Sequence, residues 1–231
     1  HLDTRVRIEW IETSDLTPDN VAEALAHVDG IIVPGGFGVR GAEGKILCIR
    51  YAREQKVPYL GICYGFQLAV VEFARNVCGL TDANSTEIDP DCGHPVIDIL
   101  PEQKQIEGLG GNMRLGGRDI LIKPGTLASK LYRGASEVRL RFRHRYEVDP
   151  QYIEILERHG LVFSGKAPDY PIMQILELPA DQHPFFIGTQ AHPELVSRPL
   201  RPEPMFVGLV SAALQRVELR DAHATAAPRS R

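Results

Sequence analysis

Two short apolar stretches, each followed by glycines and then by a helical pattern, constrain the fold of this chain most strongly. The first covers residues 30–33 and leads into the glycine-rich turn 34–38, and the second covers residues 57–62. Apolar residues then recur at helical spacing over residues 42–55 and 66–77. Wholly apolar strands that alternate with helices are typical of parallel sheets buried on both faces. We therefore predict an α/β fold with a mostly parallel central sheet flanked by helices.

Later segments predict an additional strand-rich portion of the fold. Apolar runs bounded by Gly, Pro and Asp turns indicate strands. These runs cover residues 96–100, 120–122, 138–142, 161–164, 172–178 and 185–190. Helical spacing over residues 21–28 and 202–217 predicts two further helices.

The two ends of the chain carry weaker patterns. Val6, Ile8 and Trp10 alternate with charged residues, which predicts a half-buried strand. Such folds usually open with a central strand and a helix, and this chain begins on a single strand. We expect one domain over residues 1–217 whose true start is missing, followed by a flexible tail over residues 218–231.

The second apolar strand ends in Gly61-Ile62-Cys63-Tyr64-Gly65, a pattern typical of a nucleophile elbow. In an elbow a strand turns sharply into a helix, and the flanking glycines permit a strained backbone at the central residue. The thiol of Cys63 then lies at a helix N-terminus, where free N–H groups and the helix dipole favour the thiolate. Cys48, Cys78 and Cys92 have no comparable setting and are interpreted as structural or incidental.

Attack of a thiolate on an amide requires N–H donors for the oxyanion that develops. The elbow supplies the N–H of Tyr64, and the glycine-rich turn 34–38 can bring up the N–H of Gly36. The same glycines are equally compatible with a purely structural tight turn. The turn lacks the Lys-Ser/Thr of a phosphate-binding loop.

His192 is the histidine best placed to exchange protons with the thiol. It follows the strand predicted at residues 185–190, and Glu194, two residues on, could orient its imidazole. Because reactive groups collect at the carboxyl ends of parallel strands, Cys63, His192 and Glu194 are predicted to form a catalytic triad. No cluster of residues has the spacing of a zinc site, so no metal is expected.

Charge and hydropathy exclude several classes of function. The formal net charge of −4 is spread over mixed acidic and basic residues without a long basic block, which argues against a nucleic-acid partner. No apolar run reaches the roughly 18 residues that span a bilayer, and the first residues lack a signal-peptide pattern. Four cysteines without a C-x-x-C pair fit a reducing compartment. We expect a cytoplasmic protein with no membrane partner.

Together with the turn Pro34-Gly35-Gly36, the three predicted catalytic residues resemble the class I glutamine amidotransferase family, whose fold is flavodoxin-like. The resemblance covers nearly the whole chain. Residues 84–87 (NSTE), 109–116 (LGGNMRLG) and 143–148 (RHRYEV) are similar to blocks of the amidotransferase domain of CTP synthases. The sequence departs from the usual pattern at Tyr64 and Phe66, where leucine and methionine are common, and at Asn112, where threonine is common.

The resemblance implies hydrolysis of L-glutamine to glutamate and ammonia. A separate synthase domain, absent from this chain, would use the ammonia for the ATP-dependent amination of UTP to CTP. The resemblance implies no cofactor in this domain. It implies ATP and Mg²⁺ for the synthase domain, GTP as an activator, and a homo-oligomer for the full-length enzyme. The glutamine-binding residues implied are Gly36, Tyr64, Gly65, Phe66, Gln67, Glu87 and Arg145.

The chemistry of three of these residues fits a glutamine site. Glu87 offers a carboxylate to the substrate ammonium, and Gln67, one helical turn after Cys63, can hydrogen-bond the polar head of the substrate. Arg145 also fits an alternating strand with a solvated basic face. Two alternatives stay open: another class I amidotransferase of the GMP synthetase type, which the block at residues 109–116 argues against, and a regulatory or docking module that keeps the fold with little activity.

Overall fold

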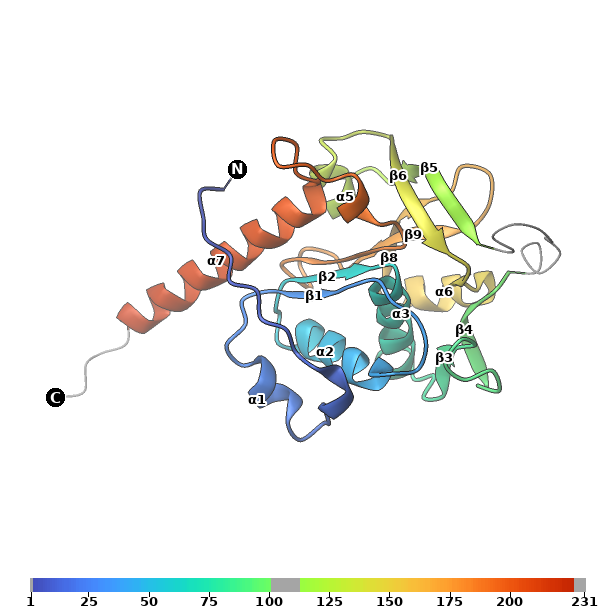
Figure 1. Cartoon of the computed structure of the whole chain (residues 1–231), viewed down its shortest axis with the longest axis horizontal. Coiled ribbons are helices and arrows are strands. Elements are labelled where there is room, and N and C mark those ends of the chain that lie inside the picture. The colour runs from blue at the N-terminus through green and yellow to red at the C-terminus, as the bar shows by residue number, and fades with distance from the viewer. Residues whose placement is uncertain (1, 101–112, 227–231) are drawn as a thin grey trace.

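The computed structural model in Figure 1 describes residues 2–100 and 113–226. Its main sheet has seven strands in the order β1-β2-β10-β9-β8-β5-β6, and a smaller sheet has three in the order β3-β4-β7. The strands are β1 (Ile31–Val33), β2 (Tyr59–Ile62), β3 (Ala83–Ser85), β4 (His94–Asp98), β5 (Arg114–Ile122), β6 (Glu137–His144), β7 (Glu147–Val148), β8 (Val162–Lys166), β9 (Met173–Glu177) and β10 (Phe186–Thr189).

Helices cover both faces of the main sheet. In Figure 1, α2 and α3 lie on one side of β1 and β2, and α7 lies on the other. The helices are η1 (Thr13–Asp15), α1 (Val21–Leu25), α2 (Ala42–Glu54), α3 (Tyr64–Asn76), α5 (Leu127–Leu131), α6 (Pro150–Arg158), η2 (Pro193–Leu195) and α7 (Pro204–Ala226). The apolar core consists of two hydrophobic clusters, one on each face of the main sheet. Tyr59 of β2 packs in the cluster that includes residues of α2 and α3, and Leu60 packs in the cluster that includes residues of α7. The sheet is therefore buried on both faces, as its apolar sequence predicts.

The parallel half of the sheet carries the candidate site. β1 and β10 both pair parallel with β2, so that Gly61 lies opposite Val33 on one side and Gly188 on the other. The remaining neighbours, from β10 through β9, β8 and β5 to β6, are antiparallel. The predicted α/β fold with flanking helices is confirmed, and the antiparallel strands form its strand-rich portion.

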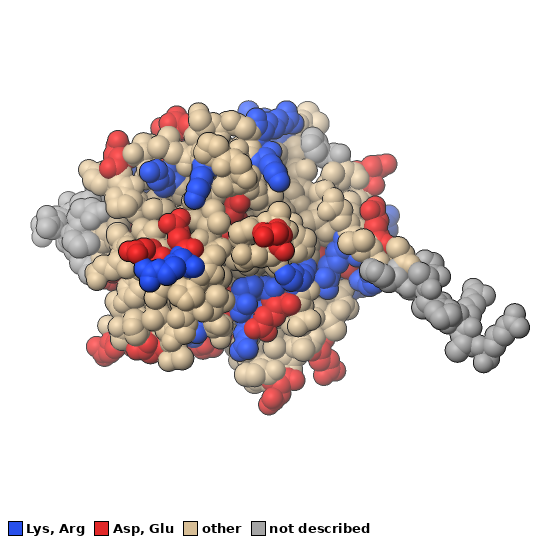
Figure 2. All heavy atoms as spheres, turned by 180° about the vertical axis from the view of Figure 1, so that it is seen from behind, with Lys and Arg blue, Asp and Glu red and all other residues tan. Residues whose placement is uncertain are grey.

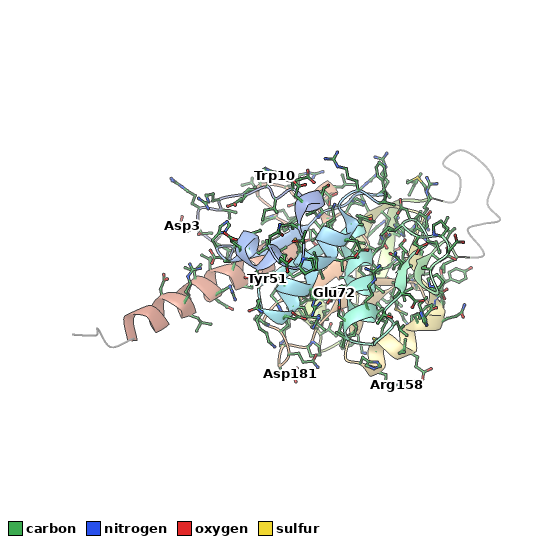
Figure 3. All side chains as sticks on the ribbon, turned by 90° about the horizontal axis from the view of Figure 1, so that it is seen from below. Asp3, Trp10, Tyr51, Glu72, Arg158 and Asp181 are labelled. Carbon is green, nitrogen blue, oxygen red and sulfur yellow. The ribbon has the colours of Figure 1, made fainter. Side chains whose placement is uncertain are left out.

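The predicted strand at Val6, Ile8 and Trp10 is wrong. Residues 2–12 have no regular secondary structure, and these three side chains are 58%, 71% and 87% exposed. Figure 3 shows Trp10 at the outer edge of the molecule. An alternating pattern produces a strand only where a neighbouring strand accepts its backbone hydrogen bonds, and among the described residues β1 pairs only with β2.

The C-terminal helix is longer than its sequence pattern predicts. α7 continues to Ala226, so residues 218–226 are helical, and the flexibility expected for residues 218–231 stays a prediction. Good helix formers such as Leu219, Arg220 and Ala222 explain the extension. No helix in the described ranges is both long and apolar enough to cross a bilayer. On the face shown in Figure 2, Lys and Arg lie interspersed with Asp and Glu.

Candidate active site

Cys63 occupies the turn between β2 and α3. Its backbone has φ 50° and ψ −94°, a conformation that L-residues rarely adopt, and its side chain is 5% exposed. A Cβ at Gly65 would lie 2.1 Å from the carbonyl oxygen of Val33, and one at Gly61 would lie 2.8 Å from the backbone of Gly65. Both flanking positions therefore require glycine. The sulfur is held at the N-terminus of the 13-residue helix α3.

His192 and Glu194 lie a few residues past the end of β10, which neighbours β2. The backbone N–H of His192 donates to the carbonyl of Arg141 on β6 at 2.8 Å. Nδ1 of its ring lies 2.5 Å from a carboxylate oxygen of Glu194. Interaction with the sulfur of Cys63, and then with Glu194, raises the pKa of His192 to about 10. Nε2 is buried and has no hydrogen-bond partner within the described residues, and the sulfur of Cys63 is the group that acts on the ring from outside the contact with Glu194.

The turn after β1 packs directly against these groups. A Cβ at Gly35 would lie 3.0 Å from Cε1 of His192 and 3.7 Å from Cβ of Cys63, and one at Gly36 would lie 3.5 Å from the ring of Tyr64. The hydroxyl of Tyr64 donates to the carbonyl of Gly38 at 2.5 Å, which ties the turn to α3. The structure therefore packs the turn that contains Gly36 against Cys63, His192 and the side chain of Tyr64.

Glu87 and Arg145 bring opposite charges to this region. A carboxylate oxygen of Glu87 accepts the N–H of Gly38 at 3.2 Å. Burial raises the pKa of Glu87, while the hydrogen bond from Gly38 and the positive charge of Arg145 act in the opposite direction. Burial, followed by the charge of Glu87, also raises the pKa of Tyr146. A ligand with an ammonium and a carboxylate would find a partner for each charge here.

The first turn of α3 is almost fully enclosed. Gly65 is buried, Phe66 is 0% exposed and Gln67 is 3% exposed. Nε2 of Gln67 donates to the carbonyl of Tyr146 at 3.0 Å and to Oε1 of Gln190 at 3.2 Å. The amide nitrogen of Gln67 thus has protein partners, and its contact with a substrate stays a prediction. The segment before Met113 in the block 109–116 lies outside the described residues.

Sequence reasoning missed two contacts to the sulfur of Cys63. Nε2 of Gln190 lies 3.5 Å from Sγ, and the carbonyl oxygen of Arg143 lies 4.0 Å from it. The position of Gln190, one residue past a strand that neighbours the elbow, is the signal that could have identified it. The contact with Arg143 has no such signal in the sequence, because it uses a backbone carbonyl and every residue type has one.

The other thiols and a buried histidine lack this setting. Burial raises the pKa of Cys48 and of Cys78 to about 11, which keeps both protonated and unreactive. Burial also lowers the pKa of His183 to about 4. His183 accepts the N–H of Phe185 at 3.1 Å and donates to the carbonyl of Ala52 at 3.0 Å, which is a structural role.

Residues 1–212 match the family model described as glutamine amidotransferase class-I. The chain is 60% identical over 211 residues to a CTP synthase of Archaeoglobus fulgidus, covering 91% of this chain and 39% of that protein. It is 59% identical over 215 residues to a CTP synthase of Thermococcus gammatolerans, covering 93% of this chain and 40% of that protein. The chain thus spans about two-fifths of these relatives.

Solved structures agree with the sequence comparison. The glutaminase domain of Trypanosoma brucei CTPS, solved with bound acivicin, has a TM-score of 0.86 and 36% identity, covering 93% of this chain and 83% of that one. A Thermoplasma acidophilum protein described as part of a putative GMP synthase has a TM-score of 0.54 at 15% identity, covering 88% of this chain and 81% of that one. The second likeness shows the fold alone.

Proposed function

Because the chain belongs to the class I glutamine amidotransferase family and corresponds to the amidotransferase domain of CTP synthases, we propose that it hydrolyses L-glutamine through Cys63, His192 and Glu194. The observation that carries this proposal is the meeting of three elements at one edge of the sheet. The elbow supplies the thiol, the residues after β10 supply the imidazole and carboxylate, and the turn after β1 supplies the backbone around them.

The first step is attack of the Cys63 thiolate on the side-chain amide carbon of glutamine. A C–S bond forms and the carbonyl electron pair moves to oxygen. We assign stabilisation of this oxyanion to the N–H groups of Gly36 and Tyr64, because Gly36 lies in the turn that packs on the elbow and Tyr64 begins α3. Both are backbone groups, so the presence of Tyr64 where relatives commonly have leucine leaves the chemistry intact.

His192 exchanges the proton that the reaction needs. With a pKa of about 10, its imidazole is protonated at neutral pH, and its positive charge faces the sulfur of Cys63. The imidazolium donates its proton to the amide nitrogen, the C–N bond breaks and ammonia leaves, giving a glutamyl thioester. Neutral His192 then takes a proton from water, the hydroxide attacks the thioester, and glutamate and the thiolate are released. Glu194 holds Nδ1 throughout.

The region between Glu87 and Arg145 fits the amino-acid head of glutamine. Glu87 would bind the α-ammonium and Arg145 the α-carboxylate, in line with the electrostatic contact between the two side chains. The remainder of a complete CTP synthase would use the ammonia for ATP- and Mg²⁺-dependent amination of UTP. GTP activation and homo-oligomer formation belong to that complete enzyme in the same proposal.

Glutamine hydrolysis by Cys63→Ala tests the proposal. We expect glutamate release to disappear, whereas Cys92→Ala, which changes a thiol in the turn after β3, retains activity. Acivicin, which is bound in the Trypanosoma brucei structure, should label the unchanged chain at Cys63 only. In a complete CTP synthase that carries the first change, ammonia-driven CTP formation should persist. Glutamine turnover that survives in Cys63→Ala would refute the proposal.

A further inference from the structure

Gln190 is the residue directly after β10, and it lies against the nucleophile. β10 pairs with β2 so that Thr189 lies opposite Ile62. The N–H of Cys63 donates to the carbonyl of Thr189 at 2.7 Å. The residue after Thr189 is therefore fixed next to Cys63 by the backbone of the sheet. The side chain of Gln190 is 0% exposed, so water does not compete for its amide group.

The neighbouring amide of Gln67 determines which way the amide of Gln190 points. Gln67 places one side-chain atom 3.0 Å from the carbonyl oxygen of Tyr146 and 3.2 Å from the amide of Gln190. A backbone carbonyl only accepts hydrogen bonds, so this atom of Gln67 must be its NH₂ group. Gln190 therefore presents its oxygen to Gln67. Its own NH₂ group is directed at Sγ of Cys63, 3.5 Å away.

The sulfur of Cys63 lies closer to a hydrogen-bond donor than to an acceptor. The N–H donor from Gln190 lies at 3.5 Å, whereas the acceptor that a neutral thiol could use, the carbonyl of Arg143, lies at 4.0 Å. A hydrogen bond donated to the sulfur stabilises the thiolate, and one accepted from it would stabilise the thiol. The closer of the two contacts is the one that supports the thiolate.

We propose that Gln190 is a further catalytic residue, whose side-chain amide donates a hydrogen bond to the sulfur of Cys63 and stabilises the thiolate. The inference rests on the proposed function in taking Cys63 as the nucleophile. The hydrogen bond acts whenever the sulfur is negatively charged, which is before attack on the amide and again when the thioester is hydrolysed. The amide of Gln190 stays neutral, and no proton passes through it.

The chain offers a matched control in Gln174. This residue lies on β9, is 1% exposed, and accepts the backbone N–H of Gln190 through its own carbonyl. Its side-chain oxygen has no hydrogen-bond partner in the described part of the chain. Replacing either glutamine by methionine keeps the length of the side chain and removes its amide. Only Gln190→Met also removes a donor to the sulfur.

The test is the rate at which iodoacetamide alkylates Cys63, followed by mass spectrometry of the peptide that contains it, between pH 5 and pH 10. In Gln190→Met we expect alkylation at pH 7 to be about tenfold slower, the effect of one hydrogen bond to a charged group. The midpoint of the pH profile should move upward by about one unit. Gln190→Glu, which places a carboxylate beside the sulfur, should move it further, and Gln174→Met should leave it unchanged.

A wild-type rate and midpoint in Gln190→Met would overturn the proposal, as would an equal shift in Gln174→Met. If Gln190→Met does not fold, the side-chain NH₂ resonances of Gln190 in the ¹⁵N-labelled unchanged chain decide. Their chemical shifts should change with pH around the midpoint of the alkylation profile and should stay constant in Cys63→Ala. Chemical shifts that do not change around that midpoint contradict the inference. Because alkylation needs no glutamine turnover, failure of the proposed function would appear separately, as absent glutaminase activity with the shift intact.

Discussion

Replacing Gly35 by alanine should impair chemistry without unfolding the protein. The new Cβ would lie 3.0 Å from Cε1 of His192, whereas carbon atoms in ordinary contact are about 3.5–4.0 Å apart. The imidazole must therefore retreat by about 0.5–1 Å. A misplacement of about 1 Å in a catalytic group costs up to about 10²-fold. We expect kcat for glutamine hydrolysis to fall about 10- to 100-fold, which is about 1.4–2.7 kcal/mol of transition-state stabilisation.

The assay compares kcat, KM and the urea midpoint of Gly35→Ala with those of Gly30→Ala. Neither glycine has a positive φ, so alanine fits the backbone at both positions. A Cβ at Gly30 meets its nearest neighbour at 3.6 Å, an ordinary contact. KM and stability should change little in either variant, and kcat should fall only in Gly35→Ala. Unchanged kcat in Gly35→Ala, or an equal loss in Gly30→Ala, would refute the reasoning.

Two further predictions concern charge. The pKa of His192 is raised from 6.5 to about 10, so its protonated form stabilises the fold fully below about pH 6.5, and this contribution is lost as the pH rises through about 10. The difference in unfolding free energy between the unchanged chain and His192→Gln should therefore shrink over that range, and a constant difference would contradict the assignment. Glu72, which is 0% exposed, forms an ion pair with Arg53 at 2.8 Å, and Glu72→Ala should lower the unfolding free energy by about 3 kcal/mol with kcat unchanged. Glu54→Ala, which removes a half-exposed partner of the same arginine, should cost less than about 1 kcal/mol, and equal losses would disprove the distinction.

The sequence predicts the elbow well because its determinants are local. An apolar strand, a glycine on each side of Cys63 and a helical pattern after it all lie within neighbouring residues. The same holds for Glu194, which follows His192 closely enough to reach its ring. These features depend on backbone conformation over a few residues, and the residue types alone indicate it.

Contacts between distant segments could not be predicted in this way. The failed strand at residues 6–10 has the correct alternation, but alternation carries no information about whether a partner strand is present. The buried side chains of Glu147 and His144 and the partly buried side chain of Arg114 join β7, β6 and β5. Nothing in the separate segments indicates that these side chains meet. The hydrogen bond from Gln190 to Cys63 likewise depends on the register of two strands that are far apart in the chain.

The position of β10 between β2 and β9 has a consequence for how the protein folds. β2 acquires its second neighbour only when a segment more than a hundred residues later in the chain has been synthesised and inserted. Until β10 is in place, Cys63 has neither His192 nor Gln190 beside it. In the proposed mechanism, the order of strands in the sheet therefore postpones activation of the Cys63 thiol until β10 has been inserted beside β2.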